Sequence, residues 1–194
     1  MRSLVHIVRH GRTALNADGR FRGLADPPLD TVGLQEVRST ALRLSGRSIA
    51  AIATSPLLRA RQTAEAITQV VGVEAAIEPG LIDADMGQWQ GLTREEAAAR
   101  DPAEYERYRS DPRRLVIPGG DDVAAVEERV RTTIEELAAA NDDLEVIVVS
   151  HELPIRLMMS AALRLDGPAL WELDLPTASM TSFIVGFRRW EIAP

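Results

Sequence analysis

The chain has 194 residues, 45% of them hydrophobic, which is enough to bury one well-formed core. Its formal net charge of -7 disfavours general attraction to nucleic acid or to an anionic membrane surface, so any anion site has to be built locally. The absence of cysteine excludes disulfides, thiolate catalysis and cysteine-bound metals. Neither a membrane-spanning run of roughly 20 apolar residues nor a signal-peptide pattern is found. We therefore expect one cytoplasmic domain over residues 1–194 that binds neither nucleic acid nor membrane.

Short β-branched apolar runs, typical of buried strands, alternate with apolar residues spaced three and four apart, typical of amphipathic helices. In chain order, the expected elements are a strand at 4–8, a helix at 34–44, a strand at 49–54, a helix at 55–71, a helix at 123–137, a strand at 146–149, a helix at 154–165 and a strand at 180–185. Ser55 followed by Pro56 is typical of a helix N-cap with proline at the first helical position.

This alternation predicts a three-layer α/β/α sandwich with a mostly parallel central sheet. In such folds the ligand binds beyond the carboxyl ends of the strands. His10 and His151 each follow an expected strand, so both should lie at that edge. Residues from about 80 to 120 are rich in acidic residues, arginine, proline and glycine, and we expect them to form a lid-like excursion over one end of the sheet.

His10 is the first candidate for chemistry, because it stands at a strand end between Arg9 and Gly11. A neutral imidazole nitrogen is a competent nucleophile toward phosphorus, and a backbone carbonyl can hold the other ring nitrogen and so fix the tautomer. The guanidinium of Arg9 offers a planar fork that matches phosphate oxygens. These three residues alone leave open a second reading, an ordinary strand-end histidine beside a surface arginine.

Four segments in order resolve this choice. The run RHGRTALN at residues 9–16 resembles the nucleophile signature of the histidine phosphatase superfamily, whose fold is the phosphoglycerate mutase-like α/β sandwich. Residues 23–35 are similar to the segment that follows the nucleophile in that family. SPLLRARQTA at 55–64 resembles its second arginine motif, and VVSH at 148–151 resembles the motif of its second histidine. The resemblance thus extends over nearly the whole chain.

The resemblance implies a role for each matched residue. His10 would be the nucleophile, while Arg9, Arg59 and His151 would surround the phosphoryl oxygens and stabilise their charge without a metal or other cofactor. Two residues of the loop after His10 are further candidate phosphate ligands, Asn16 and Arg12. For Arg12, a solvated loop charge is the alternative.

The proton donor departs from the family pattern. LIDADMGQWQG at residues 81–91 is similar to the segment in which the family usually carries an acid glutamate, and Asp83 occupies that position here. Gln90 stands where a second carboxylate is common. Since a free aspartate is ionised at neutral pH, an acid role for Asp83 requires a raised pKa. Asp85, a water relay, or an Asp83 that merely orders the loop remain alternatives.

Glu152 is a second departure, because family members often carry glycine after the second histidine. We expect its carboxylate to face out, or to meet a cation on a leaving group, since it would repel a phosphate.

The resemblance implies a phosphomonoester hydrolase, similar to acid phosphatases, that acts on a small phosphorylated metabolite through a phosphohistidine. The alternatives are a 2,3-bisphosphoglycerate-dependent phosphoglycerate mutase and a non-catalytic phosphate-binding module. The sequence leaves the oligomeric state open, a homodimer being one option.

Overall fold

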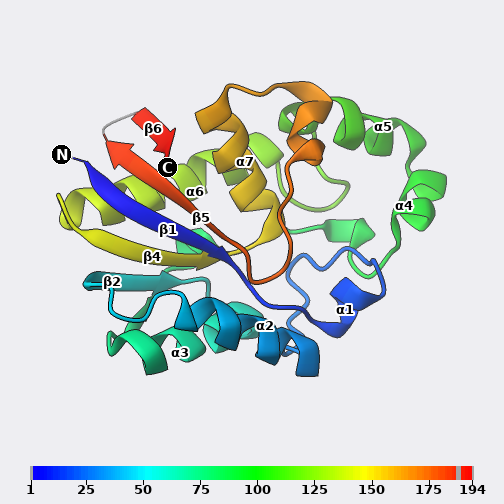
Figure 1. The fold of residues 1–194 in the computed structure, drawn as a ribbon. Coiled ribbons are helices and arrows are strands. Elements are labelled where there is room, and N and C mark those ends of the chain that lie inside the picture. The colour runs from blue at the N-terminus through cyan, green and yellow to red at the C-terminus, as the bar shows by residue number, and fades with distance from the viewer. Residues whose placement is uncertain (1, 187–188, 194) are drawn as a thin grey trace.

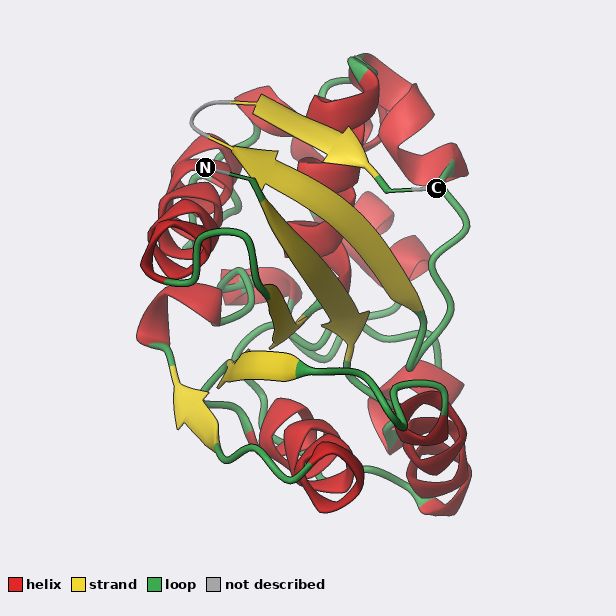
Figure 2. Ribbon diagram, turned by 60° about the vertical axis from the view of Figure 1, so that its left-hand side comes forward, coloured by secondary structure: helices red, strands yellow, loops and turns green. Residues whose placement is uncertain are grey.

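The computed structural model describes residues 2–186 and 189–193, and these form a six-stranded sheet with helices on both faces (Figures 1 and 2). The strands are β1 (Ser3–Arg9), β2 (Ile49–Thr54), β3 (Ala75–Ile77), β4 (Glu145–Ser150), β5 (Met180–Gly186) and β6 (Arg189–Ile192). The α-helices are α1 (Ala14–Ala17), α2 (Thr31–Leu42), α3 (Leu58–Val71), α4 (Arg94–Arg100), α5 (Pro102–Ser110), α6 (Val123–Ala140) and α7 (Glu152–Leu163). Short 3-10 turns cover Pro79–Leu81, Gly87–Trp89, Pro112–Arg114 and Gly167–Glu172.

The strand order is β3-β2-β4-β1-β5-β6. Strands β3, β2, β4 and β1 run parallel to one another, whereas β5 pairs antiparallel with both β1 and β6. The predicted α/β sandwich with a mostly parallel sheet is therefore confirmed. The edge strands β3 and β6 escaped sequence prediction because they are short and only partly buried, so neither carries a clear apolar run.

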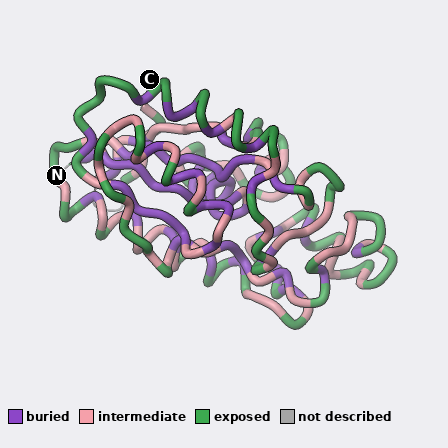
Figure 3. The backbone as a smooth tube through the Cα atoms, turned by 90° about the horizontal axis from the view of Figure 1, so that it is seen from below, coloured by how far each residue is buried: buried purple, intermediate pink, exposed green. Residues whose placement is uncertain are grey.

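Each face of the sheet has its own apolar core. Along β4, Val146 and Val148 join the core under α6 and α7, while Ile147 and Val149 join the core under α2 and α3. This follows from the two-residue period of a strand, which sends successive side chains to opposite faces. A central strand buried on both faces therefore reads as a continuous apolar run. Figure 3 shows that the buried backbone follows these central strands.

The register of β1 on β4 positions the two candidate histidines. Arg9 is paired with Ser150, and the backbone N–H of His10 donates to the Ser150 carbonyl at 3.0 Å. Because the two strands are parallel neighbours, the residues just beyond their carboxyl ends, His10 and His151, lie side by side. The sheet thus delivers both imidazoles to one edge.

The segment from 80 to 120 lies beyond that edge and contains α4 and α5, which sequence reasoning did not find (Figure 1). Both helices are mostly polar, and Ala97 and Tyr108 are their buried residues, so they lack a continuous apolar stripe. Local signals mark them instead: Thr93 and Glu96 form a capping box at the start of α4, and Pro102 opens α5. Within the described residues, no helix is long and apolar enough to cross a membrane.

Candidate active site

His10 is fully buried and is held in one tautomer. Its Nδ1 lies 2.7 Å from the carbonyl oxygen of Gly11, which can only accept, so Nδ1 carries the hydrogen and Nε2 carries the lone pair. Burial lowers the pKa of His10 well below its usual value, and the charges of Arg59 and Arg22 lower it further. The imidazole is therefore unprotonated at neutral pH, as a nucleophile must be.

His151 lies beside His10, with their ring centroids 5.2 Å apart. Its Nε2 is 2.7 Å from the hydroxyl of Ser55, and its Nδ1 is buried without a hydrogen-bond partner among the described residues. A neutral His151 that accepts the hydroxyl hydrogen at Nε2 presents an N–H at Nδ1. Burial and the Arg59 charge lower the pKa of His151 well below its usual value. His151 can thus donate one neutral hydrogen bond to a ligand.

Ser55 was expected to cap the helix that follows, and that expectation is wrong. Helix α3 begins at Leu58, and Leu57 is its N-cap residue without a side-chain capping bond. The Ser55 hydroxyl instead contacts His151 and accepts from the Leu57 N–H at 3.3 Å. The side chain therefore orients the second histidine, a role that only the tertiary structure could show.

Arg59 is fully buried and fixed by hydrogen bonds at every nitrogen. Its Nη1 donates to the Ala25 carbonyl at 2.7 Å, and its Nη2 donates to the Gly23 carbonyl at 2.9 Å and to Asp83 at 3.0 Å. Its Nε lies 3.3 Å from Nε2 of His10. The predicted arginine thus meets the predicted nucleophile, and its guanidinium is preorganised rather than free to rotate.

Asp83 reaches the same centre from the loop before Gly87–Trp89. One carboxylate oxygen, Oδ1, accepts from the Ala84 N–H at 3.0 Å, while Oδ2 binds Arg59 and lies 3.7 Å from Nδ1 of His151. Burial raises the pKa of Asp83, and the charges of Arg59 and Arg22 partly offset this. The direction of this shift is the one that an acid role requires. Gln90 binds the loop that contains Ala25, because its side-chain oxygen accepts a hydrogen bond from the Ala25 N–H at 3.0 Å.

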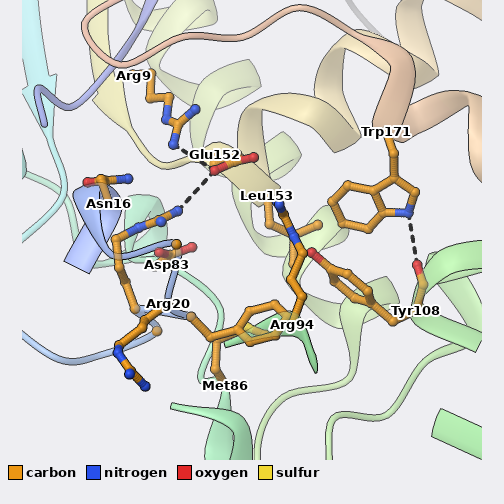
Figure 4. Close-up of a pocket in the computed structure, with 14 residues that line it drawn as sticks. Arg9, Asn16, Arg20, Asp83, Met86, Arg94, Tyr108, Glu152, Leu153 and Trp171 are labelled. Carbon is orange, nitrogen blue, oxygen red and sulfur yellow. Dashed lines mark hydrogen bonds and ion pairs between the residues drawn. The ribbon is translucent and has the colours of Figure 1, made fainter. Parts of the chain in front are cut away.

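A cleft of about 280 Å³ opens next to these buried groups (Figure 4). Its lining combines charged side chains with apolar and aromatic ones. The charged lining residues are Arg9, Arg20, Arg22, Asp83, Arg94 and Glu152. The apolar and aromatic lining residues are Phe21, Met86, Tyr108, Leu153 and Trp171. Such a lining offers charged partners to an anionic group and apolar contacts to a less polar leaving group.

Glu152 faces into this cleft, so the expectation that it faces outward is wrong. Its side chain is only 17% exposed, and its Oε2 accepts from Nη2 of Arg9 at 2.6 Å and from Nη2 of Arg22 at 3.0 Å. Its Oε1 accepts from Nε of Arg156 at 3.2 Å. Burial opposes ionisation of Glu152, but these three arginines lower its pKa overall. Their charges make an inward carboxylate tolerable here.

Arg22 is a site residue that sequence reasoning missed. It lies immediately before the matched segment at 23–35, in the loop after α1, and its charge contributes to the lowered pKa of both His10 and His151. The signal was present, since an arginine directly beside a matched motif is a candidate anion ligand. Its partner could not have been read from sequence, because Glu152 is 130 residues away.

Asn16 lines the cleft, but the structure does not bring Arg12 there. The side-chain oxygen of Asn16 accepts from the backbone N–H and the hydroxyl of Thr13, leaving its amide nitrogen to donate to a ligand. Nε of Arg12 donates instead to Asp30 at 2.9 Å, and the Arg12 side chain is 37% exposed. Arg12 therefore takes the alternative role of a loop charge.

Replacing Arg12 by alanine is expected to leave kcat/KM within about threefold of wild type, because a half-exposed ion pair contributes little. Steady-state hydrolysis of an aryl phosphate measures this. A loss comparable to that of Arg9→Ala would show instead that Arg12 reaches the phosphate during turnover.

Comparisons with known proteins show the family of the chain. Residues 5–193 match the model of the histidine phosphatase superfamily (branch 1). A bifunctional protein of Mycobacterium tuberculosis is 35% identical over 176 residues, which cover 90% of this chain and 48% of that protein, so the chain spans about half the length of this relative. Phosphoserine phosphatase 1 of Hydrogenobacter thermophilus is 32% identical over 94% of this chain and 87% of its own. A mycobacterial glucosyl-3-phosphoglycerate phosphatase, solved with VO3, superimposes with a TM-score of 0.85 at 28% identity, covering 100% of this chain and 98% of its own. The chain belongs to the histidine phosphatase superfamily.

Proposed function

We propose that the chain is a phosphomonoester hydrolase that passes the phosphoryl group of a small phosphorylated metabolite to His10 and then to water. The observation that carries this proposal is the buried, neutral His10, whose Nε2 lone pair faces the guanidinium of Arg59. A nucleophile beside a fixed cation is the arrangement that phosphoryl transfer requires, since positioning and charge stabilisation supply most of the catalysis.

The charges around the cleft support an anionic substrate. Four of the lining residues are arginines and two are carboxylates, within a protein of net charge -7. In an acidic protein, the arginines of such a cleft attract an anion at short range, although the net charge of the whole molecule repels it. Three buried N–H donors in the described structure also lack partners and could receive phosphoryl oxygens: Nε of Arg9, Nε of Arg22 and Nδ1 of His151.

The reaction has two steps. In the first, Nε2 of His10 attacks phosphorus, the bond from phosphorus to the ester oxygen breaks, and the protonated Asp83 carboxyl gives its hydrogen to the departing alkoxide. In the second, water attacks the phosphohistidine, Asp83 takes the proton from that water, and the bond between nitrogen and phosphorus breaks. Arg9, Arg59 and His151 stabilise the phosphoryl oxygens in both steps.

The size of the cleft and the names of two relatives indicate which substrates to assay first. The cleft of about 280 Å³ accommodates a phosphate and a small leaving group, and relatives bear the names of phosphatases for phosphoserine and glucosyl-3-phosphoglycerate. A small carboxylate-bearing phosphate ester is therefore the first class to assay. The cytoplasmic location stays a prediction, as does the oligomeric state.

A panel of phosphorylated metabolites assayed between pH 5 and 8, combined with rapid acid and alkali quenching, tests the proposal. We expect hydrolysis together with an alkali-stable, acid-labile phosphoenzyme whose label maps to His10. Failure to hydrolyse even an aryl phosphate would favour the non-catalytic phosphate-binding module. Mutase activity stimulated by bisphosphoglycerate, in excess of hydrolysis, would favour the mutase.

A further inference from the structure

The carboxylate of Glu152 binds one of the two adjacent donors, Nε–H and Nη2–H, on each of two arginines. A guanidinium binds a phosphate side-on through its Nε–H and the adjacent Nη2–H, which point in the same direction. On both Arg9 and Arg22, the Nη2 donor of that fork is bound to a single atom, Oε2 of Glu152, at 2.6 and 3.0 Å. Figure 4 shows Arg9 and Glu152 facing one another at the cleft, and Arg22 is the second ion-pair partner of the same carboxylate.

The other half of each fork is empty. Nε of Arg9 and Nε of Arg22 are both buried and have no hydrogen-bond partner among the described residues. Buried N–H groups are rarely left without a partner, because each one loses its hydrogen bond to water without gaining another. The two unpaired Nε–H groups therefore indicate that both guanidiniums are arranged to bind a ligand with several acceptor oxygens. A single carboxylate oxygen of Glu152 does not provide these.

We propose that Arg22 binds the substrate phosphate together with Arg9, and that the Glu152 carboxylate is a built-in occupant which the phosphate displaces from both guanidiniums. This inference rests on the proposed phosphatase function and names two further residues of its phosphate site. A phosphoryl group that spans Nε and Nη2 of each arginine takes the positions that Oε2 now holds.

The carboxylate has an anchor that remains after displacement. Arg156 holds Oε1 of Glu152 through Nε, and its Nη1 donates to the carbonyls of Leu170 and Leu173 at 3.1 and 2.6 Å. Arg156 is thereby fixed to the segment that carries Trp171 into the cleft wall. Before a phosphate binds, both carboxylate oxygens of Glu152 are paired with arginines. Its effect on the phosphate is to compete for the same donors.

Binding of inorganic orthophosphate, measured by titration calorimetry at pH 7, tests the proposal without any turnover. Glu152→Gln should tighten orthophosphate binding by about tenfold, because a like charge close to the anion is removed. Arg22→Gln should weaken it by about tenfold, because charge-assisted hydrogen bonds are lost. Glu152→Ala should shift affinity in the same direction as Glu152→Gln, which covers the case in which one variant folds poorly.

Glu96→Gln is the matched control, since Glu96 pairs with Arg20, another arginine of the cleft, and its loss changes the net charge equally. It should leave orthophosphate affinity within about twofold, as expected for an exposed ion pair. The proposal is overturned if folded Glu152 variants bind orthophosphate no better than wild type, if Arg22→Gln binds it equally well, or if Glu96→Gln tightens binding as much. A chain that binds orthophosphate in this pattern yet hydrolyses no ester would refute the hydrolase and leave the competition intact.

Discussion

His10→Ala is expected to lower kcat by at least about 10⁴-fold, because the covalent route loses its nucleophile and no other group can replace it. The neighbouring His151 cannot take over, since its Nε2 is bound to the Ser55 hydroxyl. The loss should appear in steady-state hydrolysis of p-nitrophenyl phosphate, and the acid-labile phosphoenzyme should vanish from rapid-quench samples. Orthophosphate binding should survive, because the arginines that line the cleft remain.

His6→Gln provides the matched control. His6 is a buried histidine of β1, four residues before His10, and its ring nitrogens contact Ser182 and Glu145 rather than the cleft. This variant should keep the phosphoenzyme and most of the activity even if its thermal stability falls. Persistent activity in folded His10→Ala would rule out the proposed nucleophile, whereas equal losses in both variants would indicate a folding defect.

The positions of His10 and His151 could be predicted because each depends on local sequence. Each histidine follows an apolar run that has to be a strand, and parallel neighbouring strands bring their carboxyl ends together. The helices α4 and α5 could not be found in the same way. Their short, polar sequences are held by contacts with the aromatic cluster around Trp89, and such tertiary packing overrides weak local preference.

The charged partners of the site were harder to predict than the reacting groups. The family resemblance singled out Arg9 and Arg59, but the ion pair of Glu152 with Arg22 joins the start of α7 to the loop after α1. Nothing in local sequence specifies such a pair. Repulsion between a carboxylate and a phosphate led us to expect Glu152 outside the phosphate site. The arginines gathered there bind this carboxylate and hold it inside. The electrostatics of a buried carboxylate depend on every charge within reach.

Asp83→Asn is expected to lower kcat by about 10² to 10⁴-fold for alkyl phosphates, whose alkoxides need a proton, and much less in the first step for p-nitrophenyl phosphate. Burial raises the pKa of Asp83, so its acidic form persists to higher pH than in a free aspartate and is lost as the pH rises through that value. Wild-type kcat for an alkyl phosphate should therefore fall on the alkaline side, and this limb should disappear in Asp83→Asn. A pH profile of both substrates measures this.

The same substitution should trap the intermediate. In the proposed mechanism Asp83 is also the base that activates water. We therefore expect p-nitrophenyl phosphate still to phosphorylate His10 in Asp83→Asn, and the phosphohistidine then to accumulate. Stopped-flow measurements should show a burst of nitrophenolate equal to the enzyme concentration, followed by slow turnover. Asp85→Asn is the control, because Asp85 accepts from the Gly87 N–H at 2.8 Å and lies outside the cleft lining. A burst in Asp85→Asn but not in Asp83→Asn would assign the acid and base role to Asp85. If Asp83→Asn instead lowers kcat equally for both substrates and shows no burst, Asp83 only orders the guanidinium of Arg59.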